Sequence, residues 1–404
     1  MNLYRWIAQR LQQRGEKRFF GGIVSRIAIF SIAIGLVVMV LSFAVLRGYE
    51  QVIQQKIFSF AGHIQVSQYN TNNSYEGLPI SKNTYLFKHH SKLSAVRHLH
   101  VYAHKAGILK VGNEVSGVVL KGIDRDYDTT FFAPNVLEGS LPYRDTAQTS
   151  VMISQKIAKK MQLKRNDTIL MFFIQNPPKF RKLVVGGIYE TGMEEFDEKF
   201  AFCHISLIQQ LNRWGDTLVG GYEIFAHRFE KIPEAYQQVY ENMDYDMQID
   251  SAERRYLGLF DWLLLLNTNV SIILILILSV AAFNMLSILL VLIMERTQMI
   301  GVLKAIGATY WQISVIFIYQ GYGLLLKGML WGNLVAIFLV VLQYYFKLIP
   351  LDPENYYVNA VPVAWDFFSI LYVNLLTLLL TTLVMIVPIS VVAFTRPIRA
   401  IRFD

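Results

Sequence analysis

Four long apolar stretches constrain this chain more than any other feature of its sequence. Charge-free segments cover Ile27–Leu46, Trp262–Met294, Ala305–Leu326 and Phe367–Phe394, and the third resumes after Lys327 and continues to Phe346. A bilayer is crossed by about 20 apolar residues. A buried core helix would explain one such stretch, but four in a chain with only 17% charged residues indicate a membrane protein. We therefore predict transmembrane helices at residues 22–47, 262–294, 310–346 and 367–394.

Basic side chains are distributed unevenly around these spans. Residues 1–26 carry six basic and one acidic side chain, residues 395–404 carry three and one, and residues 47–261 carry 25 and 24. Because Lys and Arg gather on the cytoplasmic side of membrane proteins, both termini and residues 295–309 are predicted to be cytoplasmic. Residues 48–261 and the loop 347–366 then lie outside. The net charge of +8 reflects this topology, and we expect no nucleic-acid partner.

The N-terminal region is interpreted in two parts. Within residues 1–21, Leu3, Trp6, Ile7 and Leu11 share one helical face, which is typical of a basic amphipathic segment lying on membrane lipids. A disordered basic tail is the alternative. The apolar run that follows is longer than the core of a signal peptide, so we expect it to remain as the first transmembrane helix.

The outer segment, residues 48–261, has the composition of a soluble domain. A two-residue alternation in His63–Tyr69 and Val96–Ile123 predicts antiparallel strands, and further strands are predicted at 169–174 and 182–189. Ser154 suits the N-cap of a short helix, Ser154–Gln162. The predicted fold class is therefore a membrane protein with four transmembrane α-helices. A large extracytoplasmic α+β domain with helical stalks lies between the first and second.

No motif in the sequence supports an enzyme, and we predict no catalytic residue. The single cysteine, Cys203, excludes a disulfide framework. Neither HExxH, nor a nucleophile elbow, nor a GxxxxGK[ST] phosphate loop occurs, so we expect no cofactor bound by this chain. His98 and His100 would share a strand face, a weak metal signal for which a solvent-facing strand is the simpler explanation. The acidic run Glu190–Glu198 likewise indicates a solvated turn, and no metal site is predicted.

The segment between the second and third spans carries the strongest functional signal. Its residues are Glu295, Arg296, Met299, Ile300, Gly301, Val302, Leu303, Lys304, Ala305, Ile306 and Gly307. The apolar residues at helical spacing are Met299, Val302, Leu303 and Ile306. Gly307 suits a C-terminal cap, and Thr309 with Gln312 forms a capping box for the next span. A plain turn would need fewer residues, so 295–309 is predicted to be a cytoplasmic helix that docks a soluble subunit.

This segment resembles the FtsX-like permease family, and most closely its lipoprotein-releasing branch, the LolC/LolE type. The family pattern Glu-x-x-x-x-Ile-Gly-x-Leu-Lys-Ala-x-Gly-Ala is matched by Glu295, Ile300, Gly301, Leu303, Lys304, Ala305, Gly307 and Ala308. The resemblance extends over almost the whole chain. It includes Ser25–Gln51 around the first span, 185–193 in the outer domain and 396–402 at the C-terminus.

The resemblance implies a non-catalytic permease subunit of an ABC transporter. ATP and Mg²⁺ would bind to a separate cytoplasmic ATPase, present in two copies, and a second permease of the same or a related kind would complete the complex. Movement would pass from the 295–309 helix along the stalks, lift a lipoprotein from the membrane and hand it to a periplasmic chaperone. The alternative is another FtsX-like branch that exports peptides or glycolipids or activates a cell-wall hydrolase. The absence of acidic residues well inside the spans disfavours an ion-coupled carrier, and the absence of a catalytic or kinase domain disfavours a membrane-anchored sensor.

Two further sites are expected on this basis. The family's chaperone-binding hook corresponds here to a short loop with Asn176, Pro177, Pro178, Lys179 and Phe180, for which a plain hairpin turn is the alternative. A cavity for lipoprotein acyl chains is predicted at the outer ends of the first two spans. Its residues are Val40, Phe43, Leu46, Tyr49, Leu259, Trp262, Leu263 and Leu266. The alternative is that these side chains pack against neighbouring helices of the same chain.

Overall fold

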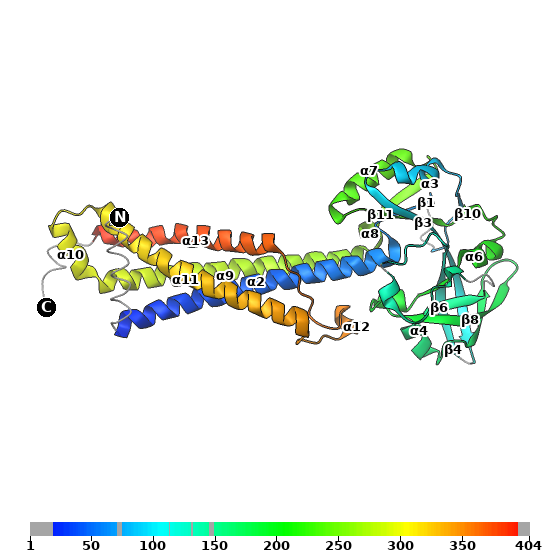
Figure 1. Ribbon diagram of the computed structural model, residues 1–404, viewed down its shortest axis with the longest axis horizontal. Helices are drawn as coiled ribbons and strands as arrows, with labels where there is room; N and C mark the ends of the chain where they lie inside the picture. The colour runs from blue at the N-terminus through cyan, green and yellow to red at the C-terminus, as the bar shows by residue number, and fades with distance from the viewer. Residues whose placement is uncertain (1–18, 71–74, 113, 131, 145–148, 395–404) are drawn as a thin grey trace. The chain divides into compact units, whose positions relative to one another are not determined.

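The computed structural model describes residues 19–70, 75–112, 114–130, 132–144 and 149–394 (Figure 1). The chain divides into two compact units. We call residues 1–51, 262–350 and 360–404 the membrane unit, and residues 52–261 and 351–359 the outer domain. The predicted amphipathic segment (mainly residues 1–18) and the tail 395–404 lie outside the described residues.

The membrane unit is built from long helices. They are α2 (Phe19–Ala61), α9 (Leu257–Glu295), α11 (Tyr310–Phe346) and α13 (Phe367–Phe394), with the short α10 (Thr297–Ala305) between α9 and α11. In the described part of the chain, four helices are long and apolar enough to cross a membrane. This confirms the four predicted spans. Helices α2 and α9 also extend beyond the membrane unit, since each continues into residues of the outer domain.

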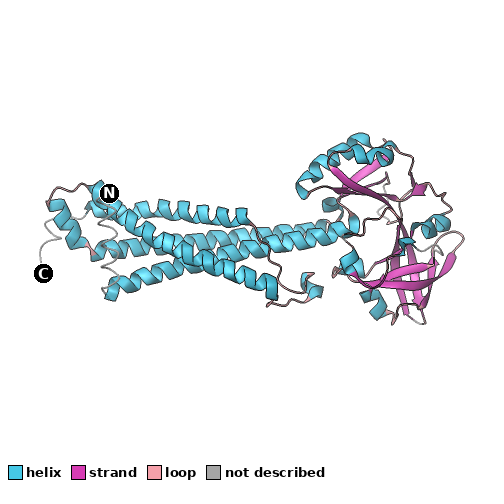
Figure 2. Ribbon diagram, viewed as in Figure 1, coloured by secondary structure: helices cyan, strands magenta, loops and turns pink. Residues whose placement is uncertain are grey.

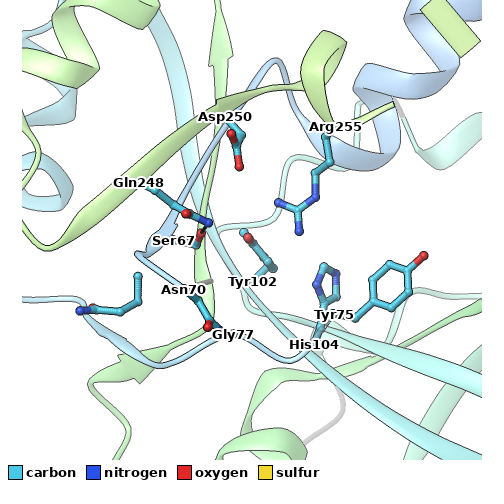
Figure 3. A pocket seen from close by; sticks show the side chains of 11 residues that line it. Ser67, Asn70, Tyr75, Gly77, Tyr102, His104, Gln248, Asp250 and Arg255 are labelled. Atoms are coloured by element: carbon cyan, nitrogen blue, oxygen red, sulfur yellow. Dashed lines mark hydrogen bonds between the residues drawn. The ribbon is translucent and has the colours of Figure 1, made fainter. Parts of the chain in front are cut away.

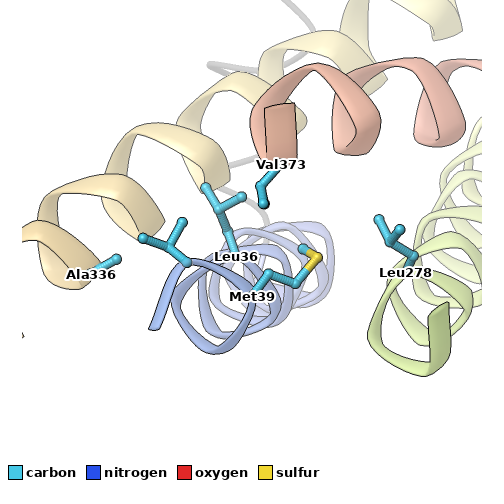
Figure 4. Close-up of a cluster of buried hydrophobic side chains, with 6 residues drawn as sticks. Leu36, Met39, Leu278, Ala336 and Val373 are labelled. Carbon is cyan, nitrogen blue, oxygen red and sulfur yellow. The ribbon is translucent and has the colours of Figure 1, made fainter. Parts of the chain in front are cut away.

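Apolar side chains from all four long helices meet in the membrane unit. One buried cluster comprises Leu36, Met39, Val40, Leu278, Ala336 and Val373 (Figure 4). Two glycines of α11 let it approach α2 closely. A Cβ on Gly328 would lie 2.8 Å from the Cβ of Ile32, and one on Gly332 would lie 3.0 Å from the Cβ of Leu36. Their spacing is the small-xxx-small pattern that brings membrane helices together.

Polar side chains also join these helices. The amides of Asn333 on α11 and Asn374 on α13 donate to each other at 2.8 and 2.9 Å. Asn284 on α9 donates to Ser31 on α2 at 2.6 Å. In an apolar surrounding each amide needs a partner, so these pairs favour one arrangement of the bundle.

The outer domain holds the named strands, as Figure 2 shows. Within the described residues, ten strands form one sheet in the order β12-β1-β11-β3-β4-β9-β6-β8-β5, with β7 pairing β3 and β8. The strands of this sheet are β1 (Ile64–Gln68), β3 (Val96–Val111), β4 (Glu114–Ile123), β5 (Val136–Gly139), β6 (Ser150–Ser154), β7 (Thr168–Phe173), β8 (Lys179–Tyr189), β9 (Phe200–His204), β11 (Gly221–Ala226) and β12 (Met247–Ser251). A second sheet pairs β2 (Ile80–Ser81) with β10 (Leu218–Val219).

Short helices complete the outer domain. They are α3 (Tyr85–His89), α4 (Gln155–Lys160), α5 (Glu194–Asp197), α6 (Ile205–Asn212), α7 (Ile232–Asn242), α8 (Ala252–Arg255) and α12 (Pro353–Tyr356). The predicted α+β class is confirmed, as is Ser154 as an N-cap, since its side chain accepts from the Ile157 N–H at 3.0 Å.

The interpretation of Glu190–Glu198 as a solvated turn is wrong in part. Asp197 is buried, and its carboxylate accepts from the backbone N–H groups of Thr191 and Gly192. The run therefore folds into an ordered turn followed by α5, because the Asp197 carboxylate satisfies backbone donors that would otherwise be buried without partners.

Candidate functional site

Helix α10 is separated from α11 by signals at its C-terminal end. Gly307 follows it with a φ of +93°, which L side chains rarely adopt, and the Ala308 N–H donates back to the Leu303 carbonyl at 2.9 Å. The predicted capping box at the start of α11 is confirmed, since Thr309 and Gln312 exchange hydrogen bonds between side chain and backbone. These caps hold α10 as a separate helix between two spans.

The structure divides the apolar residues of α10 into two groups. Ile300 is fully buried in a cluster with Ile293, Ile313 and Phe317, and Met299 and Leu303 pack partly against it. By contrast, Val302 and Ile306 are 52% and 76% exposed. The four apolar residues of the predicted docking helix are therefore not equally available to a partner, because the bundle covers Met299 and Leu303 in part. Contact with an ATPase stays a prediction, which the geometry restricts to a narrower surface.

That surface, which we call the docking patch, surrounds the two exposed apolar side chains. Its members are Glu295, Val302, Ala305, Ile306 and Gly307, all exposed, with Arg296 and Lys304 half-buried beside them. Gly301 is buried with Ile300 on the opposite side of the helix. Apolar groups with charged neighbours are typical of a protein-binding surface.

A second candidate site lies in the outer domain, where α2 ends. Lys121 of β4 is fully buried, and its ammonium donates to the Phe60 carbonyl of α2 and to both carboxylate oxygens of Glu223 at 2.8 and 2.9 Å. The ring of Phe60 lies 4.6 Å from the same ammonium. Because a helix leaves its last carbonyls without intrahelical partners, Lys121 anchors the end of α2 to the sheet.

Gln65 connects the second stalk, which is the outer part of α9, to the end of α2. Its side-chain amide donates to the Ala61 carbonyl and to Glu223, both at 3.0 Å, and its carbonyl oxygen accepts from Arg255 of α8. Helix α8 leads into α9, whereas Ala61 is the last residue of α2. We call Phe60, Gln65, Lys121, Glu223 and Arg255 the stalk junction, since it joins the outer ends of both stalks.

Burial and charge determine the protonation states at the stalk junction. Burial acts to raise the pKa of Glu223, but Lys121 and His100 outweigh it and hold that pKa at about 2. Burial lowers the pKa of Lys121, and Glu223 opposes this shift. The Nε2 atom of His100 lies 2.9 Å from a carboxylate oxygen of Glu223. Its Nδ1 accepts from the Asp128 N–H, which leaves the proton on Nε2 to donate to the carboxylate. Glu223 is thus ionised and fully partnered.

A further contact ties the loop before α13 to the first stalk. Lys56 on α2 donates to the carbonyls of Thr191 and Tyr357 at 2.6 and 2.8 Å. Residues 351–359, which the sequence suggested were part of a plain loop, therefore belong to the outer domain. Burial is the main cause that lowers the pKa of Lys56, and Asp197 and Glu190 oppose it.

Sequence reasoning missed the stalk junction, although a signal was present. Lys121 and Glu223 are charged residues within largely apolar strands that are buried on both faces around them. A charged residue at an inward position predicts a buried partner. What the sequence does not supply is the identity of the partner, since Lys121 and Glu223 lie 102 positions apart.

The predicted acyl-cavity residues are packed within the described chain. Val40, Leu46, Tyr49, Leu259 and Leu263 are buried, while Phe43, Trp262 and Leu266 are half-buried. Rings account for part of this packing, since Tyr49 contacts Trp262 edge-on at 5.9 Å. The pocket that Val40 and Phe43 line has a volume of only about 10 Å³. The acyl cavity stays a prediction that requires these helices to separate or a second permease to complete it.

The predicted hook is a hairpin between β7 and β8. Asn176, Pro177 and Pro178 lie in the turn, whereas Lys179 and Phe180 belong to β8 and pair with Phe173 and Phe172. The placement of these two residues in the loop is therefore wrong, because the strand pairing extends beyond the boundary the sequence suggested. The Lys179 ammonium and the Gln175 amide both donate to the Leu211 carbonyl, which fixes the hairpin to α6. Ile174 and Phe180 are 80% and 62% exposed at its tip.

The two histidines predicted to share a strand face lie close together in the structure. In the described part of the chain, no group of three or more metal-ligating side chains is present. His98 and His100 do lie close, with ring centroids 5.5 Å apart. The solvent-facing alternative is wrong for His100, which is 1% exposed because it binds Glu223.

Comparison with known proteins identifies two matching families along the chain. Residues 25–225 match the MacB-like periplasmic core domain, and residues 271–397 match the FtsX-like permease C-terminal family. The first region contains most of α2 and most of the outer-domain sheet. The second contains most of α9 together with α10, α11 and α13.

Relatives of known name match over nearly their full length. The lipoprotein-releasing system transmembrane protein LolC of Xylella fastidiosa is 20% identical, with 98% of each chain covered. LolC of Neisseria meningitidis is 22% identical, with 100% of each chain covered. LolE of Haemophilus influenzae is 20% identical, with 98% of each chain covered.

Proposed function

The chain belongs to the FtsX-like permease family and is an ABC transporter permease of the LolC/LolE type, and we propose that it extracts lipoproteins from the inner membrane. In this role it couples ATP hydrolysis by a separate ATPase to the release of lipoproteins for a periplasmic chaperone. The names of relatives that match along their full length support the choice of cargo. The observation that carries the mechanism is one uninterrupted helix, α2, from Phe19 to Ala61, whose outer end is anchored by buried side chains.

The docking patch on α10 is the proposed contact for the ATPase. Val302 and Ile306 would insert into the partner, while Glu295 and Lys304 would form polar contacts at the rim. Burial of each apolar side chain contributes roughly 1.5–3 kcal/mol. ATP and Mg²⁺ bind to the partner, two copies of which face two permeases of the same or a related kind.

The stalk junction is the proposed point at which movement reaches the outer domain. A buried ion pair with several further hydrogen bonds resists separation more than apolar contacts do, because breaking it leaves charges without partners. If α2 or α9 were displaced, the sheet would then move with the helix, and the helix would not slide past the sheet. Separation of the outer halves of α2 and α9 would expose Val40, Phe43 and Leu263 to acyl chains.

The tip of the β7–β8 hairpin is the proposed chaperone contact. The exposed side chains Ile174 and Phe180 supply apolar area, and Lys179 fixes the hairpin to α6. The contact would be smaller than a long hook provides, so this chain would contribute only part of the chaperone site.

Co-purification of the complex tests the proposal. Ile306→Asp should reduce recovery of the ATPase by at least about tenfold, because it places a carboxylate in an apolar contact. Leu348→Asp is a matched control, since Leu348 is 58% exposed on the membrane unit and lies outside the docking patch. A photo-crosslinker at Phe43 should capture an acylated lipoprotein when the ATPase turns over.

Two outcomes would contradict the proposal. Equal recovery of the ATPase with Ile306→Asp and Leu348→Asp would exclude the docking patch. A cell-wall hydrolase in the purified complex, with no acylated protein crosslinked at Phe43, would instead place this chain in another branch of the family.

A further inference from the structure

The outer domain contains a polar cavity that none of these roles uses. Its volume is about 450 Å³, and Figure 3 shows the side chains that line it. Its position follows from strand register. Ser67 on β1 pairs with Gln248 on β12 and with Gly221 on β11, and Gly221 in turn pairs with Tyr102 on β3. Side chains paired in this way share one face of a sheet, so a polar row forms where apolar residues are usual.

The lining combines donors and acceptors of hydrogen bonds. Arg255 can only donate, and the carboxylate of Asp250 can only accept at neutral pH. His104 is 9% exposed, and its buried Nε2 has no hydrogen-bond partner within the described residues. In Figure 3 the side chains of Arg255, Tyr102 and His104 extend toward the same space. Because buried polar atoms are almost always paired, this nitrogen indicates a polar ligand.

The charges of the lining favour an uncharged ligand. Burial, assisted by the charge of Lys121, lowers the pKa of His104 to about 3, so the imidazole is neutral at neutral pH. The charges of Arg255 and Asp250 then cancel. An anion would be repelled by Asp250 and a cation by Arg255.

Hydroxyl groups fit such a lining, because each can both donate and accept. The ring of Tyr75, which is 45% exposed, adds a flat apolar face against which C–H groups can pack. A sugar ring presents both kinds of surface, with hydroxyls at its edge and C–H groups on its faces.

We propose that this cavity binds a sugar ring through Arg255, Asp250, His104 and the tyrosines. The site lies beyond the proposed transport function and depends on neither the ATPase nor the cargo. Because Arg255 also donates to Gln65 of the stalk junction, a bound sugar would contact the place where the stalks meet the sheet.

Saturation-transfer NMR on the full-length chain in lipid nanodiscs tests the proposal. The probes are glucose, galactose and N-acetylglucosamine, with glycylglycine as a zwitterionic comparison. We expect transfer to the ring protons of at least one sugar at about 10 mM, the range in which weak single-ring binding is measured.

Gly77→Leu should weaken sugar binding at least about tenfold. Gly77 lines the cavity, and the nearest atom to a Cβ there is the Gly220 oxygen at 3.9 Å, so leucine would fill the space without a backbone clash. Gly215→Leu is the matched control, since nothing lies within 4 Å of its Cβ and it is outside the cavity. Asp250→Asn, which keeps the side-chain shape, should also weaken binding.

The proposal is overturned if no sugar shows transfer with the unaltered chain. It is also overturned if Gly77→Leu and Asp250→Asn bind as tightly as Gly215→Leu, or if glycylglycine binds and the sugars do not. Retained binding by Gly215→Leu together with loss in either cavity variant supports it.

Discussion

At the scale of single residues, the buried charges of the outer domain are the most constrained part of the molecule. Lys121 and Glu223 are 0% and 1% exposed, and both make several hydrogen bonds. Such a pair adds little net stability over apolar residues, but removal of one member leaves the other charge buried alone. The consequence is specificity, because few other arrangements of the α2 terminus would satisfy Lys121.

Glu223→Gln should lower the free energy of unfolding of the outer domain by about 3–5 kcal/mol at neutral pH. The neutral side-chain amide of glutamine cannot balance the positive charge of the Lys121 ammonium. The measurement is denaturant unfolding of the full-length chain, in which hydrogen exchange in β4 and β11 reports the unfolding of the outer domain. Glu194→Gln is the control, since Glu194 and Lys156 form an ion pair with 50% and 38% exposed side chains, for which under about 1 kcal/mol is expected. Equal losses for both variants would contradict the role of Glu223.

The same carboxylate predicts a dependence of stability on pH. The pKa of Glu223 is about 2 in the folded chain against an ordinary value of 4.5, so its ionised form is favoured by folding. Its contribution of about 3 kcal/mol is present above pH 4.5 and is lost as the pH falls towards 2. Glu223→Gln should therefore show a shallower loss of stability between these pH values than the unaltered chain.

At the scale of elements, α10 depends on local signals at its C-terminal end. Its C-terminus ends because Gly307 takes a positive φ, and α11 begins because Thr309 and Gln312 cap its first turn. The buried Ile300 then fixes which face of α10 turns outward. The caps thus delimit α10, and the burial of Ile300 determines the outward orientation of Val302 and Ile306.

Gly307→Ala should destabilise the cap by about 1–2 kcal/mol, because an L side chain is strained at this φ. We expect a lower Tm and weaker ATPase binding in the same variant. Gly258→Ala is the matched control, since Gly258 lies inside α9 without a positive φ and has nothing within 4 Å of its Cβ. Alanine there should be neutral or stabilise by up to about 1 kcal/mol. A similar fall in Tm for both variants would disprove the cap argument.

At the scale of the whole molecule, specific pairs hold the membrane helices in register. The close approach at Gly328 and Gly332 and the reciprocal pair Asn333–Asn374 involve helices that are far apart in sequence. Apolar side chains alone do not distinguish helix neighbours from lipid, so small residues and amides determine which helices pair.

The coupling between Asn333 and Asn374 should be about 0.6–2 kcal/mol in a double-mutant cycle with leucine. Unfolding of the chain in a detergent series provides the measurement. Ser271→Ala is the control, because Ser271 is exposed and its hydroxyl donates only to Asn267 in its own helix. A coupling energy near zero would show that the amide pair does not join α11 to α13.

Cysteine labelling should establish the orientation of the chain. Tyr245 of the outer domain is fully exposed, so Tyr245→Cys should react in intact cells with a maleimide that cannot cross the inner membrane. Native Cys203 should not react with the maleimide, because it is buried and burial raises the pKa of its thiol. Ile306→Cys, on the docking patch, should react only after permeabilisation. The reverse pattern would refute the charge-based topology.

The sequence by itself determined the features that depend on local periodicity. Four apolar runs, the caps at Gly307 and Thr309, and the alternation of Val96–Ile123 each predicted an element that the structure contains. The physical reason is that spans, caps and strands obey the energetics of neighbouring residues. The patterns therefore predicted the fold class and a short helix within 295–309, and the docking role of that helix stays a prediction.

Only the tertiary structure decided which residues meet. It paired Lys121 with Glu223, joined Tyr357 to Lys56, divided the apolar face of α10 and enclosed the polar cavity around His104. The α10 face is divided by contacts with the adjoining ends of α9 and α11, whereas the other three depend on strand register or contact between segments distant in the chain. A buried charge or an exposed apolar side chain is recognisable only once its surroundings are fixed, because desolvation depends on all the atoms around it rather than on its sequence neighbours.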